Sequence, residues 1–119
     1  MSYDDSNIFA KILKGDIPCK KVHEDDHVLA FHDINPQAPV HILVIPKGAY
    51  KDMDDFTKNA SADEIAALFR VLGDIARAQG LDETGYRVIS NCGANGGQEV
   101  PHLHLHLLGG RKLGRMLAA

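Results

Sequence analysis

Hydrophobic residues recur with a helical period in two parts of the chain. Residues 8–13 place Ile8, Phe9 and Ile12 on one face, Ser6 can cap this turn, and Gly15 and Pro18 interrupt it. From residue 61 the stretch SADE matches a capping box, and apolar residues keep a 3.6-residue spacing from 65 to 76 before Gly80. Two helices are therefore predicted, a short one near the start and a long one in the second half.

Five shorter stretches have the composition of β-strands. They cover residues 21–24, 27–33, 41–45, 86–92 and 100–108, and the third is apolar on both faces, which is typical of a central strand. Residues 49–60 have no clear pattern, and no element is predicted there. The order of helices and strands, with short connections that suit antiparallel pairing, predicts an α+β fold.

The last predicted strand carries three of the seven histidines. In a strand, alternate residues point to the same side, so His102, His104 and His106 form a row and the leucines between them face a core. Two interpretations stand: a metal site, or a nucleophilic imidazole supported by its neighbours. The first and third positions lie roughly 13 Å apart along a strand, and no further ligand is evident nearby, which weakens the metal interpretation.

A glycine-rich loop precedes this strand. Residues 93–97 include three glycines, which let backbone N–H groups approach an anion without obstruction by side chains. An imidazole that attacks phosphorus needs such donors around the phosphate oxygens. Loop and histidines together favour phosphate chemistry.

Length, composition and charge exclude several classes of protein. The 119 residues fit a single domain spanning 1–119, with 45% hydrophobic and 24% charged residues. A net charge of −3 argues against general binding to nucleic acid. Two cysteines imply no disulfide framework, and no apolar run suits a signal peptide or a membrane span. A cytoplasmic protein without membrane association is expected.

The segment HLHLHLL resembles the histidine-triad signature of the HIT superfamily. The segments SNIFAKILKGDIP, EDDHVLAFHDINPQAPVHILVIPK and GYRVISNCGANGGQEVPHLHLHLLGGR are similar to its Hint branch, the histidine-triad nucleotide-binding proteins, and cover more than half of the chain. The resemblance implies a five-stranded antiparallel sheet with two helices, and a homodimer with a continuous ten-stranded sheet. It also implies hydrolysis of purine nucleoside phosphoramidates, with AMP- or GMP-type nucleotides bound and no cofactor or metal required.

The resemblance assigns roles residue by residue. His104 is the nucleophile that attacks the α-phosphorus, His106 lies near the phosphate and the leaving group, and His102 and His41 support the nucleophile. The remaining residues implied to contact the nucleotide are Asn91, Gly97 and Glu99 at the phosphate, Asp33 at the ribose, and Ile8, Phe9, Ile12, Phe31, Ile34 and Asn35 around the base.

Some positions depart from the family pattern or have simpler explanations. Glu99 would repel a phosphate if ionised, so it is expected to turn outward or to act on the leaving group, and Pro101 replaces a common aromatic residue. His41 could be structural and Asp33 a turn residue, while the residues on the face of the first helix could be ordinary core. Alternative functions are dinucleoside polyphosphate hydrolysis, a nucleotide-binding regulatory role, and metal binding through His102 and His104.

Overall fold

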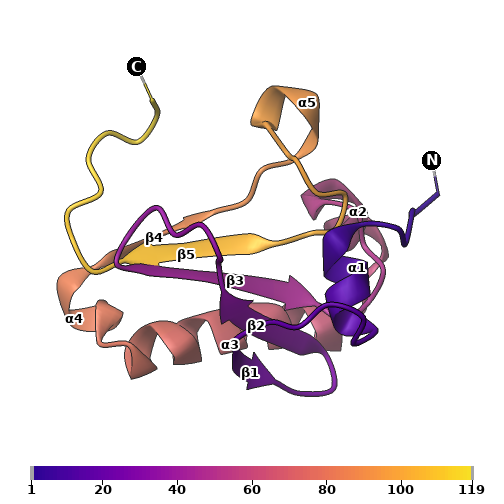
Figure 1. Cartoon of the computed structure of the whole chain (residues 1–119), viewed down its shortest axis with the longest axis horizontal. Coiled ribbons are helices and arrows are strands. Elements are labelled where there is room, and N and C mark those ends of the chain that lie inside the picture. Colours follow the sequence, from indigo (N-terminus) through magenta and orange to yellow (C-terminus); the bar gives the residue numbers. More distant parts are fainter. Residues whose placement is uncertain (1, 119) are drawn as a thin grey trace.

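One antiparallel sheet organises the molecule. The computed structural model describes residues 2–118, and its strands follow the order β1-β2-β3-β5-β4 (Figure 1). The class and the five antiparallel strands are confirmed. The strands are β1 (Lys21–Glu24), β2 (Val28–His32), β3 (Val40–Pro46), β4 (Tyr86–Ile89) and β5 (Leu105–Gly109).

The described residues contain five helical segments where two were predicted. They are α1 (Ile8–Leu13), α2 (Met53–Asn59), α3 (Ala62–Ala78), α4 (Leu81–Thr84) and α5 (Gly93–Gly96). The two predicted helices correspond to α1 and α3. Helix α2 lies in residues 49–60, where no element was predicted. It buries only one side chain, Phe56, so the sequence has no repeating apolar face that would indicate a helix. Helices α4 and α5 are single turns.

Local capping chemistry fixes where the main helices begin. The Ser61 hydroxyl accepts from the Glu64 N–H and the Glu64 carboxylate accepts from the Ser61 N–H, which confirms the capping box of α3. At α1 the cap is Asn7, whose side-chain oxygen accepts from the Ala10 N–H at 2.9 Å. The predicted cap, Ser6, instead donates its N–H to Asp4.

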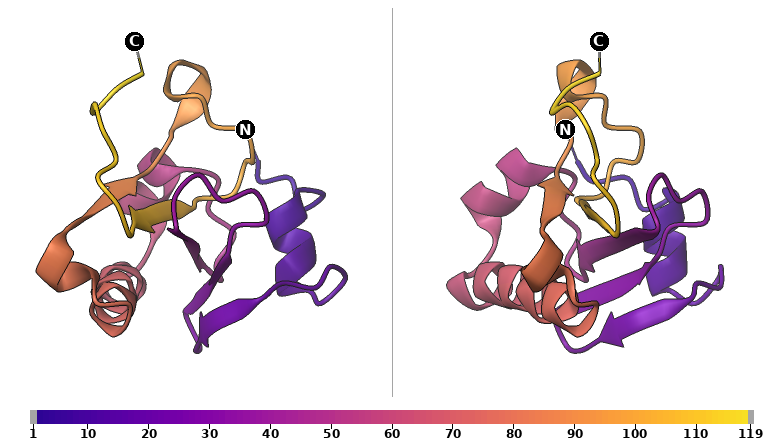
Figure 2. Two further views of the ribbon diagram at one scale, coloured as in Figure 1. Left: turned by 60° about the vertical axis from the view of Figure 1, so that its left-hand side comes forward. Right: turned by 90° about the vertical axis from the view of Figure 1, so that its left-hand side faces the viewer.

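Helices cover the sheet on both faces. The larger core joins α3 to one face, and the smaller core joins Phe9 of α1 to Leu29, Phe31, Leu43 and Ile45 on the other face. The end-on view of α3 shows the sheet between it and α1 (Figure 2, left). Across residues 2–118, no helix combines the length and apolar character needed to cross a membrane.

The final strand is shorter than predicted. Pairing with β3 begins at Leu105, opposite Val44, so His102 and His104 precede the ladder. Their backbone is held differently: His102 donates its N–H to the Val100 carbonyl, and Leu103 donates to the Tyr50 carbonyl. Alternation nevertheless persists, because Leu103, Leu105 and Leu107 belong to the α3 core.

The histidine side of this segment is covered, not open to solvent. The ring of Phe9 in α1 meets the rings of His102 and His104, and these two histidines are only 0% and 7% exposed. The sequence predicted correctly that the leucines face a core. It did not reveal that α1 provides a second cover on the opposite side.

Candidate active site

A cavity of about 310 Å³ lies beside the histidines. Its walls come from α1 and the turn after it, from β2 and the following loop, from β3, from the α5 loop, and from the segment that leads into β5. The lining residues are Ile8, Phe9, Ile12, Ile17, Pro18, Cys19, Phe31, His32, Asp33, Ile34, Gln37, Leu43, Asn91, Gly97, Glu99, Val100, His104 and His106.

The cavity brings together most of the predicted site residues. Eleven of the fourteen line it, whereas His41 and His102 lie behind the wall and Asn35 donates its backbone N–H to Asp33 from outside the lining. Sequence reasoning missed seven lining residues: Ile17, Pro18, Cys19, His32, Gln37, Leu43 and Val100. For Ile17, Pro18 and Cys19, the sequence offered one indication. They follow shortly after α1, whose residues were already predicted to line the pocket.

His104 has one nitrogen fixed by the backbone. Its Nδ1 lies 2.8 Å from the carbonyl oxygen of His102, and because a carbonyl only accepts, the Nδ1 atom carries the proton. In a neutral ring the Nε2 atom then keeps its lone pair. Burial lowers the pKa of His104, against the smaller opposing effect of that carbonyl, so the ring is neutral at pH 7. This is the state that a nucleophilic imidazole requires.

His102 uses both ring nitrogens inside the protein. Nε2 donates to the Pro46 carbonyl at 2.9 Å, so Nδ1 is the acceptor for the Tyr3 hydroxyl at 2.6 Å. Burial lowers the pKa of His102 to about 4. With both nitrogens occupied and the side chain inaccessible, His102 is unsuited to ligating a metal, which removes the alternative based on His102 and His104. Its link to His104 is the backbone carbonyl.

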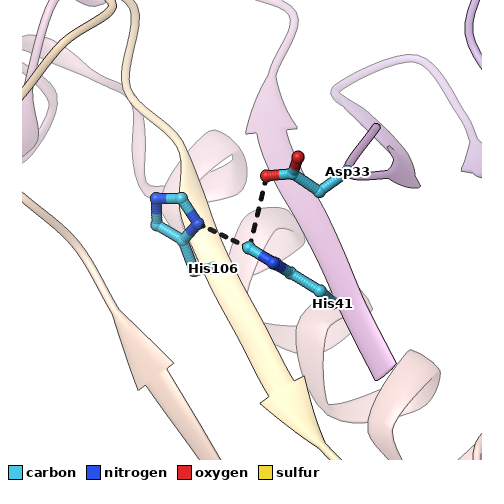
Figure 3. A group of neighbouring side chains, drawn as sticks. All are labelled: Asp33, His41 and His106. Carbon is cyan, nitrogen blue, oxygen red and sulfur yellow. Dashed lines mark hydrogen bonds and ion pairs between the residues drawn. The ribbon is translucent and has the colours of Figure 1, made fainter. Parts of the chain in front are cut away.

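His41 and His106 form a second hydrogen-bonded pair, and Asp33 lies beside His41 (Figure 3). The Gln37 N–H donates to His41 Nδ1 at 3.0 Å, so the proton of His41 lies on Nε2. That proton points to His106 Nδ1 at 2.9 Å, and Asp33 Oδ2 lies 3.3 Å from the same nitrogen. His106 must then carry its own proton on Nε2. His106 lines the cavity, and the His41 ring lies against it with the centroids 5.2 Å apart.

His41 and His106 are both neutral at pH 7. Burial is the main cause that lowers the pKa of His41, with Asp33 acting in the opposite direction. Burial, with repulsion from His104 and His41, lowers the pKa of His106 to about 4. The Asp33 carboxyl oxygen therefore lies close to a neutral His41 ring and does not form an ion pair with it.

The same three side chains have the residue types and spacing of possible metal ligands. One atom from each of Asp33, His41 and His106 lies within 4.8 Å of the others. A metal on His41 Nε2 would move the ring proton to Nδ1, where it would face the Gln37 N–H. The tautomers therefore fit a hydrogen-bond chain better than a metal site.

Gln98 holds the glycine-rich loop beside the cavity. Its side-chain oxygen accepts from the Gly93 N–H at 3.1 Å, and its amide donates to the carbonyls of Lys51 and Val100 at 2.6 and 2.9 Å. Gly97 adopts a left-handed conformation (φ 76°) and lines the cavity near Asn91. The loop is thus fixed at its base while Gly97 borders the cavity.

Comparison with known proteins agrees with this arrangement. The HIT domain family matches residues 14–113. An uncharacterised 13.2 kDa HIT-like protein of Azospirillum brasilense is 64% identical over 116 residues, covering 98% of this chain and 95% of the relative. The purine nucleoside phosphoramidase of Escherichia coli (strain K12) is 48% identical over 117 residues, covering 96% of this chain and 95% of that enzyme.

Solved structures share the fold. A HIT family hydrolase from Legionella pneumophila superposes with a TM-score of 0.85 at 44% identity, over 92% of this chain and 96% of that one. These matches extend along nearly the whole chain, so they include the cavity as well as the sheet.

Proposed function

The chain belongs to the HIT-domain family, and on that premise we propose that it hydrolyses purine nucleoside phosphoramidates, in which an adenylate or guanylate is joined through nitrogen to an amine. The observation that carries the proposal is the state of His104: neutral, with its proton held on Nδ1 by a backbone carbonyl, in the wall of a cavity. The Escherichia coli relative named purine nucleoside phosphoramidase supports the choice of substrate class.

In the proposed first step, the lone pair on His104 Nε2 attacks the α-phosphorus. A phosphorus–nitrogen bond forms to the imidazole, and the bond to the amine breaks with its electron pair leaving on nitrogen. The ring now carries a positive charge, which the His102 carbonyl stabilises through the Nδ1 proton. In the second step water attacks phosphorus, the bond to Nε2 breaks, and the lone pair returns to His104.

The reaction needs a proton donor for the departing amine, and His106 and Glu99 differ in their suitability for this role. Amine departure consumes one proton and hydrolysis of the intermediate releases one. His106 is neutral and its Nδ1 already accepts from His41, so its Nε2–H is suited to hydrogen-bonding the phosphate or the departing nitrogen rather than to giving up its proton. Glu99 is an exposed member of the lining, where its carboxyl group can exchange the proton with solvent near the leaving group.

The nucleotide is proposed to lie along the cavity with its base against α1. Phe9, Phe31 and Ile12 offer apolar surface, and the Asp33 carboxylate can accept hydrogen bonds from two ribose hydroxyls. Asn91 and the backbone at Gly97 supply donors for the phosphate, as the glycine-rich loop predicts.

Turnover of a defined substrate panel tests this function. We expect the purified protein to release AMP from adenosine 5′-phosphoramidate and from an adenylate joined to the lysine side-chain nitrogen, and to form an adenylylated protein during turnover. AMP release is followed by chromatography, and the intermediate by a mass increase after rapid alkaline quenching, because acid would hydrolyse the phosphorus–nitrogen bonds. Turnover of diadenosine polyphosphate in preference to both phosphoramidates would contradict the proposal.

We also propose that the protein is a homodimer joined through β4. This strand is an edge of the sheet, and Tyr86 and Val88 on it are 44% and 39% exposed, as is Phe69 of α3 at 46%. Sedimentation equilibrium is expected to give about twice the 13.0 kDa chain mass, and Val88→Lys to shift the protein toward the monomer. A monomeric wild-type protein at micromolar concentration would refute this interface.

A further inference from the structure

A tyrosine at the beginning of the chain contacts the triad. On the basis of the proposed function, we propose that Tyr3 is a positioning residue for the nucleophile: its hydroxyl group holds the His102 imidazole, and through the His102 carbonyl it sets the orientation of His104. Nothing in the pattern of the triad points to Tyr3, because 99 positions separate it from His102.

The Tyr3 hydroxyl has a defined donor and a defined acceptor. It donates to His102 Nδ1 at 2.6 Å and accepts from Asn7 Nδ2 at 3.0 Å. The Tyr3 ring meets the His102 ring edge-on, with the centroids 5.6 Å apart. Burial raises the pKa of Tyr3, so the hydroxyl keeps its proton and remains a donor. One hydroxyl therefore joins the N-terminal segment to a buried histidine.

The contact matters for His104 because the backbone here lies outside the β-ladder. Pairing between β3 and β5 begins at Leu105, so the ladder does not position the His102 carbonyl, and its peptide unit is held by one backbone hydrogen bond, from the Leu103 N–H to the Tyr50 carbonyl. The His102 side chain adds two further anchors at its ring nitrogens, Tyr3 on one side and the Pro46 carbonyl on the other. When one anchor is lost, the carbonyl that orients His104 Nδ1 becomes less constrained.

Asn7 extends this connection to the cavity wall. Its side-chain oxygen caps α1 by accepting from the Ala10 N–H, while its amide donates to Tyr3 and to the Asp4 carbonyl. Helix α1 carries Phe9, which lines the cavity and lies 4.9 Å from the His104 ring between centroids. The wall proposed to bind the base and the nucleophile are thus held by one hydrogen-bonded network.

Tyr3→Phe tests the role because it removes the hydroxyl and keeps the ring. We expect kcat for adenosine 5′-phosphoramidate to fall about 10-fold, while the dissociation constant for AMP changes by less than about 2-fold, since no proposed nucleotide contact is lost. Tyr50→Phe is the matched control. It also removes a half-buried hydroxyl, one that donates to Glu64 on α3, and it is expected to retain wild-type kcat.

Histidine NMR supplies a readout that does not depend on catalysis. In the wild type, His102 Nδ1 is expected to show the ¹⁵N shift of a hydrogen-bonded acceptor. Tyr3→Phe should move this signal toward that of a free acceptor and shift the His104 resonances, whereas Tyr50→Phe should leave both in place. Asn7→Ser, which retains a capping side chain but removes the donor to Tyr3, should cause smaller changes in the same direction.

The results separate this inference from the proposed function. Equal kcat in Tyr3→Phe and Tyr50→Phe, or unchanged His102 and His104 spectra in Tyr3→Phe, would overturn the role of Tyr3. A wild-type protein that hydrolyses no phosphoramidate would overturn the proposed function instead, and the His104 spectrum would still decide whether Tyr3 positions that ring. Thermal unfolding of each variant identifies any loss of activity caused by unfolding.

Discussion

His104→Ala is expected to lower kcat for phosphoramidate hydrolysis by on the order of 10⁴-fold or more, because it removes the atom proposed to form the covalent intermediate. AMP binding should persist, since the apolar wall, Asp33 and the α5 loop are unchanged. Single-turnover kinetics and calorimetric titration with AMP measure the two effects separately. The adenylylated species expected for the wild type after alkaline quenching should be absent from this variant.

The control for this substitution is His27→Ala. His27 is exposed in the turn before β2, so the same change of residue type there should leave both kcat and AMP binding intact. Measurable turnover in His104→Ala within 100-fold of the wild type would exclude His104 as the nucleophile.

Acidification is expected to destabilise the fold well above the pH at which most carboxylates titrate. The pKa values of His102 and His106 are about 4 in the folded protein, against about 6.5 in an unfolded chain. Between these values the unfolded chain binds more protons, so the stabilisation is complete above pH 6.5 and is lost as the pH falls toward 4. Buried His102 should contribute a slope of up to roughly 1.4 kcal/mol per pH unit, and half-buried His106 less.

Urea unfolding at several pH values between 7.5 and 4.5 measures this slope. His102→Gln should reduce the dependence of the free energy of unfolding on pH, whatever its effect at pH 7.5, because one shifted group has been removed. His27→Gln, which changes an exposed histidine, should leave the dependence as in the wild type. A free energy of unfolding that is constant over this range would contradict the assignment of buried neutral histidines.

The sequence predicted those elements whose stabilising interactions lie within a few neighbouring residues. The capping box at Ser61 and the apolar period after it are complete within a few turns, so α3 was predicted at the correct place. Strand β1 was predicted with its correct bounds for a similar reason. Helix α2 was missed because its cap, Asp52, and its one buried side chain, Phe56, gain their meaning from contact with the rest of the core.

At the candidate site, several features depend on residues far apart in the sequence and could not be predicted from local patterns. Alternation in residues 102–107 correctly separated the histidines from the leucines, yet the strand itself begins only at Leu105. Its start is set by pairing with Val44, 61 positions earlier, and the cover over the histidines is set by α1. The tautomers of His102 and His41 could not be predicted either. The groups that fix them, Pro46, Tyr3 and Gln37, lie on other segments of the chain.

The hydrogen bond between Tyr3 and His102 joins the first and last parts of the chain. Closing a loop of this length carries an entropic cost that other contacts in the sheet must offset. During synthesis on a ribosome, Tyr3 emerges before His102 and cannot make this contact until residue 102 has been added. A nascent or truncated chain that ends before His102 therefore lacks both the acceptor for Tyr3 and the proposed nucleophile, His104.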